Sequence, residues 1–224
     1  MSEEIQDIPL FPLSVVLFPG MSLPLHIFEE RYRWMIANCL ESDRQLGVIL
    51  AKPEAAGAIA AYSIGTSALI THVDEQKDGS MDILTAGLER FRVLYLLHTE
   101  PYLVGRIEWF PLESTRASEV TELANKVKAP FTRYLRLVSE VLGTTIRIES
   151  TPRDPTELAY LMAIALQVSM EEKQELLSIP SLPVLLRREY VILSREELLL
   201  RRMQKAQSHS TGYIRGITSD FSIN

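Results

Sequence analysis

The side chains that most often carry out chemistry in proteins are few in this sequence and widely spaced. The histidines lie far apart, and none stands at a metal-ligand spacing from an acidic residue. Because a zinc site needs ligands that converge on one ion, the sequence predicts no metal site. Serines and lysines are present, but they form no pattern that identifies a protease dyad. The histidines are His26, His72, His98 and His209.

Cys39 is the only cysteine, which excludes an intramolecular disulfide and any multi-cysteine zinc site. A nucleophilic cysteine needs a nearby base and a stabilised thiolate. Cys39 lies instead on the apolar stripe of an expected helix, together with Tyr32, Met35, Ile36 and Leu40. The sequence therefore predicts a buried structural thiol.

The sequence lacks the usual phosphate-binding motif of ATPases. None of the ten glycines is followed by lysine, which a phosphate-binding P-loop requires. We expect no ATPase site of that kind, no cofactor and no enzymatic activity. A hydrolase of unknown kind is the weakest alternative, because no catalytic constellation supports it.

Arg90, Phe91, Arg92 and Tyr95 are the residues that most resemble a nucleic-acid interface, since basic and aromatic side chains together bind single strands. The other interpretation, which we favour, is a strand with a buried side and exposed arginines. The chain has a net charge of −6, and residues 1–112 carry −7, from 8 basic and 15 acidic residues. Because nucleic-acid binding needs a basic surface, we expect no such partner.

Residues 9–28 contain no charged side chain, and their length alone would suggest a membrane span. Four prolines interrupt them, and each proline inside a helix costs about 3 kcal/mol. Short extended pieces fit better, joined by turns such as the one expected at 18–21. The acidic N-terminus is also unlike a secretory signal. We expect a cytoplasmic protein that is not associated with a membrane.

Residues 1–112 read mostly as strands, and we take them as one domain. One helix beginning near Glu30 interrupts the strands, and Asp78-Gly79 is a strong hairpin signal. The expected strands cover 21–27, 45–50, 64–73, 81–95 and 102–110.

Residues 113–206 read as helices, and we expect them to form a bundle. Apolar residues recur at helical spacing over 120–142, where Pro130 predicts a kink or a break near Lys128. Capping patterns at Asp154 and Ser169 predict a helix through Val168 and a short helix to about Ser178.

Leucine and isoleucine side chains that repeat every seven residues predict a long helix over 181–205. We interpret the arginines on its other sides as a solvated face, and the alternative is a surface for an anionic partner. Residues 207–224 show no clear period. They fit a flexible end, or a strand or arm that docks on a neighbour.

Several motifs, taken together and in order, resemble the N-terminal domain of Lon proteases over roughly residues 5–205. The opening IPLFPLSVVLFPG at 8–20 is followed by LPLHIFEERYR at 23–33 and by LGVIL at 46–50. Further along come Gly65-Thr66, AGLERFRV at 86–93, Pro101-Tyr102 and EEKQELL at 171–177.

This resemblance implies an α+β fold, in which a PUA-like, partly open β-barrel with one inserted helix precedes the helical bundle. It also implies a non-catalytic module that recognises protein substrates. The ATPase and Ser-Lys protease modules of Lon have no counterpart here, since there is no Gly-Lys and no Gly-Pro-Ser-Ala-Gly-like segment. The single cysteine excludes the RING-containing and cereblon-type relatives. We expect a stand-alone protein of the bacterial type.

The apolar segment 9–28 is the strongest functional candidate, because it holds more apolar side chains than the inner face of a small barrel needs. We predict that some of them line a groove between barrel and bundle, since exposed apolar patches often mark protein contacts. In the other interpretation they fill the barrel and its seam. The candidates are Phe11, Val16, Phe18, Met21, Leu23 and Phe28.

Two functions follow from these observations. The first is a module that binds unfolded or hydrophobic polypeptide segments or a protein partner, or that self-associates, with an extended peptide pairing to an open sheet edge. The alternative is RNA binding, because PUA-like folds elsewhere bind RNA, although fold is a weak guide to function.

Overall fold

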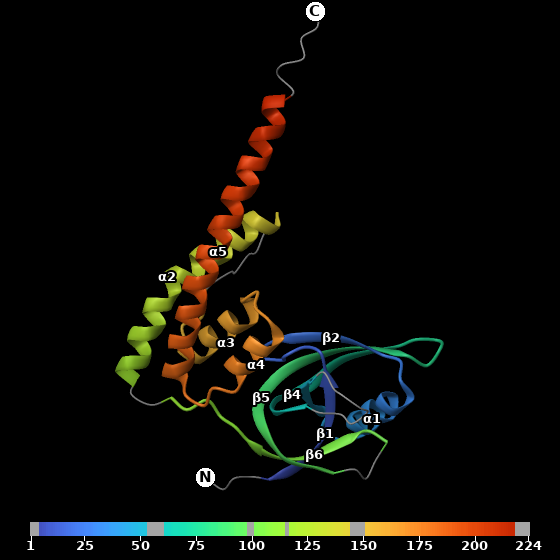
Figure 1. Ribbon diagram of the computed structural model, residues 1–224. Coiled ribbons are helices and arrows are strands. Elements are labelled where there is room, and N and C mark those ends of the chain that lie inside the picture. The colour runs from blue at the N-terminus through green and yellow to red at the C-terminus, as the bar shows by residue number, and fades with distance from the viewer. Residues whose placement is uncertain (1–4, 53–60, 98–100, 115–116, 144–150, 218–224) are drawn as a thin grey trace, which may run out of the picture.

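The computed structural model describes residues 5–52, 61–97, 101–114, 117–143 and 151–217, with side chains up to residue 205. Six strands come first and are followed by the helices, apart from one helix between the second and third strands (Figure 1). The α+β class predicted from the sequence is confirmed. The strands are β1 (Gln6–Leu13), β2 (Ser22–Ile27), β3 (Gln45–Ala51), β4 (Ala61–Glu75), β5 (Met81–Leu97) and β6 (Leu103–Trp109).

The strands form one mixed sheet in the order β2-β5-β4-β3-β1-β6. Only β1 and β3 run parallel, and the other pairs are antiparallel. The long strand β5 also pairs with β6, so the pairings run in a ring from β5 through β4, β3, β1 and β6 back to β5. Strand β2 pairs only with β5 and stays outside this ring as an edge.

Two turns expected from the sequence are present. In the turn between β1 and β2, the Met21 N–H donates to the Phe18 carbonyl at 3.0 Å, and Gly20 has a φ of 80°. Proline followed by glycine at a positive φ suits such a turn. In the hairpin between β4 and β5, Gly79 has a φ of 81°.

The ring is filled by Phe91, whose side chain is fully buried against Ile8, Leu10, Ile49 and Ile107. Glycines make room for it. A Cβ atom on Gly65 would lie 2.6 Å from Cζ of Phe91 and 2.5 Å from the backbone oxygen of Val48. Helix α1 (Glu30–Glu41) covers another face of the strands, where Met35 and Ile36 are buried together with Cys39.

The helices that follow the strands are α2 (Ala117–Leu142), α3 (Pro155–Ala165), α4 (Met170–Leu177) and α5 (Leu182–Ile217). Side-chain contacts between α2 and α5 follow the same order along both helices, from Glu119 with Arg187 to Glu140 with Gln204. The two helices are therefore parallel, and Figure 1 shows them side by side.

Three details of the helices differ from the sequence prediction. Helix α2 continues through Pro130 without a break, because Val127 and Phe131 on either side are buried in the same apolar cluster. Helix α3 ends at Ala165 rather than Val168, since Leu166 is extended and buried. Helix α5 continues past Lys205 to Ile217, as elongation of an established helix costs little.

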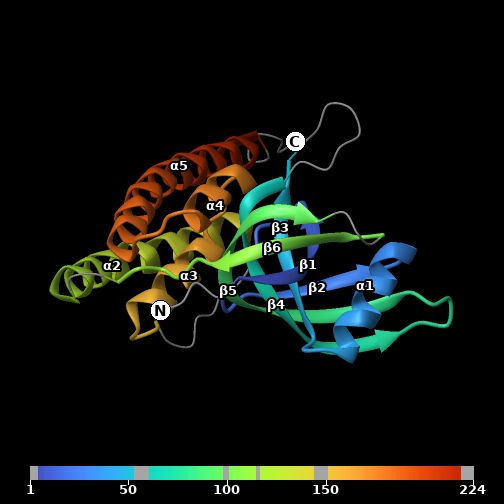
Figure 2. The same ribbon diagram turned by 90° about the horizontal axis from the view of Figure 1, so that it is seen from below.

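The largest buried cluster joins the two halves of the protein. It contains apolar side chains from all four of these helices, together with Val16 and Phe18 from the turn before β2 and Leu50 and Ile64 from β3 and β4. Figure 2 shows α3 and α4 next to the strands, with α2 and α5 farther out. Among the described residues, no helix is long and apolar enough to cross a membrane.

We expect the change Gly65→Ala to lower the free energy of unfolding by about 2 kcal/mol, because the added methyl group overlaps a backbone oxygen that cannot turn away. Urea denaturation measures this loss. The exposed residue Ser63 on the same strand provides the control, and Ser63→Ala should change little. Equal stability of the two variants would contradict this account of the interior.

Candidate functional site

A buried arginine joins β5 to the end of α4. The side chain of Arg90 is only 2% exposed, and its Nη1 donates to the carbonyl oxygens of Leu177 at 2.6 Å and Ile179 at 2.7 Å. The last carbonyls of a helix lack partners within the helix and carry partial negative charge, so a cation suits this position. Burial nevertheless lowers the pKa of Arg90, and its Nε and Nη2 have no hydrogen-bond partner in the part of the chain that the structure describes.

Other polar contacts hold the same junction. Gln174 of α4 donates to the carbonyl of Ile64 on β4 at 3.0 Å. The backbone of Glu113, just after β6, accepts from Leu182 and donates to Pro180, which fixes the segment before α5. The sheet and the helices are therefore joined by hydrogen bonds as well as by apolar packing.

The turn between β1 and β2 is fixed on β5. Gly20 donates to the Gly87 carbonyl at 2.9 Å, and Gly87 donates to the Met21 carbonyl at 2.8 Å. A Cβ atom on Gly87 would lie 2.3 Å from the backbone oxygen of Phe18, so only glycine allows this approach. Pro19 is thereby held facing α3.

A groove lies at this junction, and we call it the junction groove. It has a larger part of about 850 Å³ and a smaller, more apolar part of about 320 Å³, which share Pro19, Thr156 and Tyr160. Leu88, 38% exposed, presents an apolar side chain to the larger part. The remaining lining includes the aromatic residues Trp109 and Phe110 and the apolar residues Pro111, Leu112, Leu161, Ile164 and Pro180.

Phe110, which lines the groove, contacts two arginines of β5. The guanidinium carbons of Arg90 and Arg92 are 4.8 and 4.5 Å from its ring centroid. Such cation–π contacts stabilise both charges and ring. Arg92 also forms an ion pair with Glu108 at 2.5 Å.

The structure places the six predicted residues in different surroundings. Val16 and Phe18 lie at the seam between sheet and helices, but they are buried there. Phe11 and Leu23 are buried against α1. Met21 is partly buried against both clusters, and only Phe28 is strongly exposed, at 66%. None of the six lines the junction groove.

The interpretation of Arg90 as an exposed side chain was wrong. Alternation along β5 places Phe91 inside the ring and Arg90 on its outer side, and α4 covers that outer side. Arg92 remains exposed.

Sequence reasoning also missed Gln174 and Glu189, both buried. The sequence does hold a signal for the burial of Glu189, because this residue falls four residues after Leu185 and three before Ile192, within an apolar stripe.

Glu189 of α5 is fully buried, and neither of its carboxylate oxygens has a partner among the described residues. Burial raises its pKa well above the ordinary value of about 4.5, because the charged form loses its contact with water. Tyr160 lies close to Glu189, and burial raises the pKa of Tyr160 as well. The charge of Arg90 lowers the pKa of Tyr160, whereas the carboxylate of Glu189 raises it.

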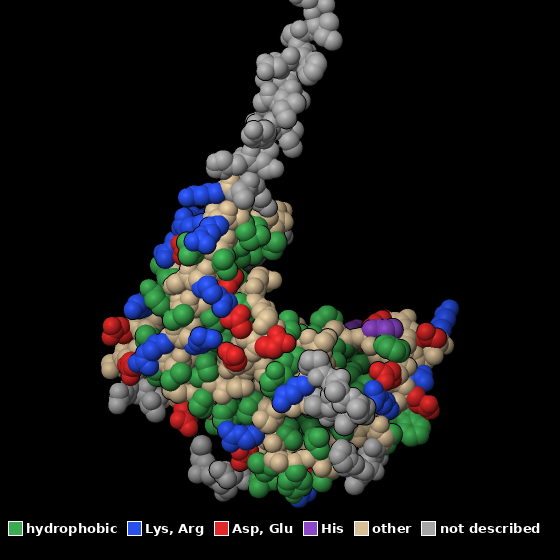
Figure 3. All heavy atoms as spheres, viewed as in Figure 1, with side chains coloured by type: hydrophobic (Ala, Val, Ile, Leu, Met, Phe, Trp, Pro, Cys, Tyr) green, Lys and Arg blue, Asp and Glu red, His purple; other side chains and the backbone are tan. Residues whose placement is uncertain are grey.

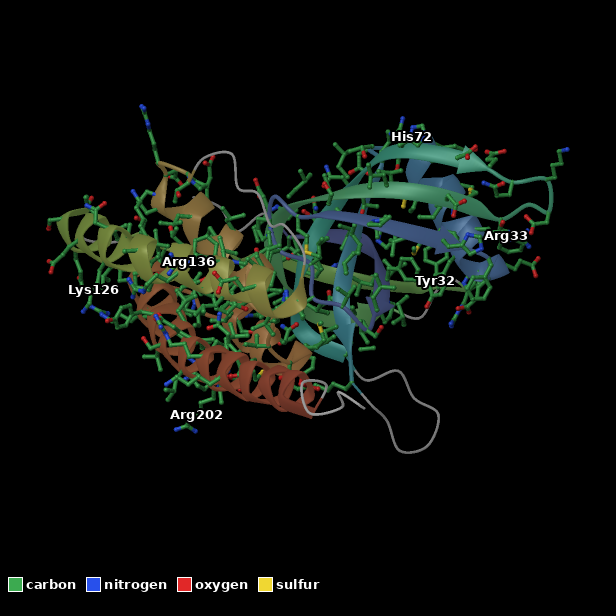
Figure 4. The ribbon with its side chains drawn as sticks, turned by 90° about the horizontal axis from the view of Figure 1, so that it is seen from above. Tyr32, Arg33, His72, Lys126, Arg136 and Arg202 are labelled. Atoms are coloured by element: carbon green, nitrogen blue, oxygen red, sulfur yellow. The ribbon has the colours of Figure 1, made fainter. Side chains whose placement is uncertain are left out.

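The other candidate chemical groups do not form a site. His26 contacts Asp82 at 2.8 Å on the exposed side of β2, and His72 is exposed on β4 (Figure 4). His98 and the side chain of His209 lie outside the described residues. Cys39 is buried, which raises the pKa of its thiol to about 11. No group of acids, histidines and cysteine in the described part of the chain is suited to a metal ion.

Basic side chains gather on the helices rather than at the groove. Figure 3 shows them along the outer surface of α5, and in Figure 4 Lys126 and Arg202 point away from the protein. Several form ion pairs with glutamates, among them Arg195 with Glu172 at 2.7 Å.

This fold belongs to a known class of domain. The family model of the ATP-dependent protease La (LON) substrate-binding domain matches residues 7–195. The chain therefore belongs to the LON substrate-binding domain family, as its motifs indicated.

Curated relatives support the assignment. The chain is 29% identical over 210 residues to a Lon protease of Anaeromyxobacter dehalogenans and 28% identical over 214 residues to Lon protease 2 of Myxococcus xanthus. Each match covers 92% of this chain but only 25% and 26% of the respective relative. The chain thus spans about a quarter of their length.

Solved structures share the fold. The N-terminal domain of a Lon protease from the Mycobacterium avium complex aligns with a TM-score of 0.63 at 20% identity, covering 84% of this chain and 98% of that one. A Lon N-terminal domain protein from Xanthomonas campestris aligns with a TM-score of 0.57 at 23% identity, covering 82% and 96%. The family match includes no catalytic domain, and these comparisons do not support the RNA-binding alternative.

We expect Arg90→Met to lower the free energy of unfolding by about 3 kcal/mol, because two carbonyls at the end of α4 lose a charged donor. Arg92→Met is the matched control, since Arg92 is exposed and its ion pair contributes about 1 kcal/mol or less. Urea denaturation of both variants measures the difference. Similar losses would show that Arg90 does not join the two halves.

We expect Glu189→Gln to change how stability depends on pH. Above about pH 4.5 the unfolded chain releases the Glu189 proton while the folded chain keeps it, so folding loses about 1.4 kcal/mol per pH unit until the raised pKa is reached. The glutamine variant lacks this loss. Urea denaturation of both proteins from pH 4.5 upwards should give a difference that widens with pH, and a constant difference would contradict a raised pKa of Glu189.

Proposed function

We propose that this protein is a non-enzymatic recognition module that binds unfolded or hydrophobic polypeptide segments in the junction groove. The observation that carries the proposal is the groove itself, which lies between the sheet and the helices of a LON substrate-binding domain and is lined by apolar and aromatic residues together with charged ones. Its smaller part is mainly apolar, and pockets that combine apolar walls with polar groups are typical ligand sites.

The edge strand gives an extended segment a way to bind. β2 begins at Ser22, close after Gly20, which lines the smaller part of the groove. A peptide that adds to the free edge of β2 gains backbone hydrogen bonds, and its chain continues towards the groove. Val16 and Phe18 would contribute indirectly, because their buried side chains hold the turn that forms the groove wall. The ring of strands would correspond to the partly open PUA-like barrel.

The test uses Leu88 and Phe28, two exposed apolar residues at different places. Leu88 lines the groove, whereas Phe28 lies after β2 and lines neither part of it. Leu88→Ser should weaken binding of a short fluorescein-labelled peptide with a Leu-Phe-Leu core about tenfold, because a buried leucine contact is worth about 1.5 kcal/mol. Fluorescence anisotropy measures the affinity.

Phe28→Ser is the matched control and should leave the affinity unchanged. Circular dichroism should show that both variants remain folded, since both positions are exposed. If only Phe28→Ser weakened binding, the site would lie at the apolar segment 9–28 and not in the junction groove. No binding to the unaltered protein would reject a polypeptide-recognition function.

A further inference from the structure

Some of the charged side chains that line the junction groove have partners among the described residues, and others do not. Its two arginines are already engaged, Arg90 with backbone carbonyls of α4 and Ile179, and Arg92 with Glu108. Three other carboxylates line the groove, namely Glu89, Glu113 and Glu157. All three are exposed, and their side chains form no ion pair or hydrogen bond with the described residues.

These carboxylates come from three different elements around one apolar floor. Glu89 is on β5 next to Leu88, Glu113 follows β6, and Glu157 is in the first turn of α3. Together with Glu108, these carboxylates outnumber the two arginines of the lining by four to two, so the groove carries a formal net charge of −2. Complementary charge speeds association with the right partner, and like charge disfavours the wrong one.

A second observation points to a hydrogen-bond acceptor in the same ligand. Arg90 lines the groove, and its buried Nε and Nη2 find no partner among the residues that the structure describes, although buried donors are normally satisfied. Nη1 already binds two peptide carbonyls. A third peptide carbonyl, supplied by the ligand, would accept from Nε and Nη2, which point to the same side of the planar guanidinium.

Taken together, these features describe one kind of occupant. We infer that the junction groove selects extended polypeptide segments in which apolar residues are flanked by lysine or arginine. The apolar side chains lie on the floor formed by Leu88 and Tyr160, and the flanking cations lie near Glu89, Glu113 and Glu157. Acidic segments are rejected by the same carboxylates. This inference rests on the proposed function, because it specifies the substrate class of the same groove.

The test compares three labelled peptides with one Leu-Phe-Leu core and with lysine, serine or glutamate flanks. Fluorescence anisotropy should give the tightest binding with lysine, about threefold tighter than with serine at low salt, and the weakest with glutamate. The preference should shrink near 0.15 M salt, where exposed charges are screened beyond about 8 Å.

The triple variant E89Q/E113Q/E157Q should lose the preference for lysine while binding the serine-flanked peptide as before. The matched control E30Q/E41Q/E75Q removes the same charge at exposed positions on α1 and β4 and should keep the preference. Equal affinities for the lysine and serine peptides, or equal loss of preference in both triple variants, would overturn the inference.

The experiment can refute the charge selection without refuting the proposed function. Binding of the serine-flanked peptide that Leu88→Ser weakens, without any preference for lysine, would overturn the charge selection alone. Binding of none of the three peptides would overturn the proposed function and this inference together.

Discussion

The arrangement of the two halves depends on the hydrogen bonds of the buried Arg90 guanidinium. Moving a charged side chain out of water costs several kcal/mol, and this cost must be offset locally. Hydrogen bonds from a charged donor to the carbonyls of Leu177 and Ile179 offset part of it, and the ring of Phe110 contributes further. Because those carbonyls lie at and just after the end of α4, Arg90 fixes where this helix meets the sheet.

The groove follows from that geometry. Helix α4 and the segment before α5 are held to the sheet, while the turn at Pro19 is held against Gly87. Between these fixed points, the start of α3 and the outer side of β5 face each other across the junction groove. The hydrogen bonds at the Pro19 turn and at the end of α4 therefore fix two sides of the groove.

Much of the fold could be predicted from the sequence because its signals are local. The alternation in β5, the Asp78-Gly79 hairpin and the caps at Asp154 and Ser169 each act within a few residues. The motifs that resemble Lon placed the chain in the right family. The course of α2 through Pro130 was harder to foresee, because the packing of distant helices determines it.

The site was only partly predictable. The sequence indicated a groove between the two halves, but it assigned that groove to the apolar segment 9–28, most of whose candidates are buried. The residues that line the groove, such as Leu88, Trp109 and Tyr160, come from β5, β6 and α3. No spacing along the chain links these residues, since tertiary contacts alone bring them together. The burial of Arg90 has the same origin, as its cover comes from a helix more than 80 residues away.

The central claim is that polypeptide segments bind where the sheet meets the helices. Hydrogen–deuterium exchange of the backbone, with and without a saturating apolar peptide, tests it most directly. The account predicts slower exchange in the peptide complex at residues 87–92, 109–113 and 156–161, which border the groove, and unchanged exchange in α1. Protection confined to α1 and the segment around Phe28, or no protection at all, would contradict it.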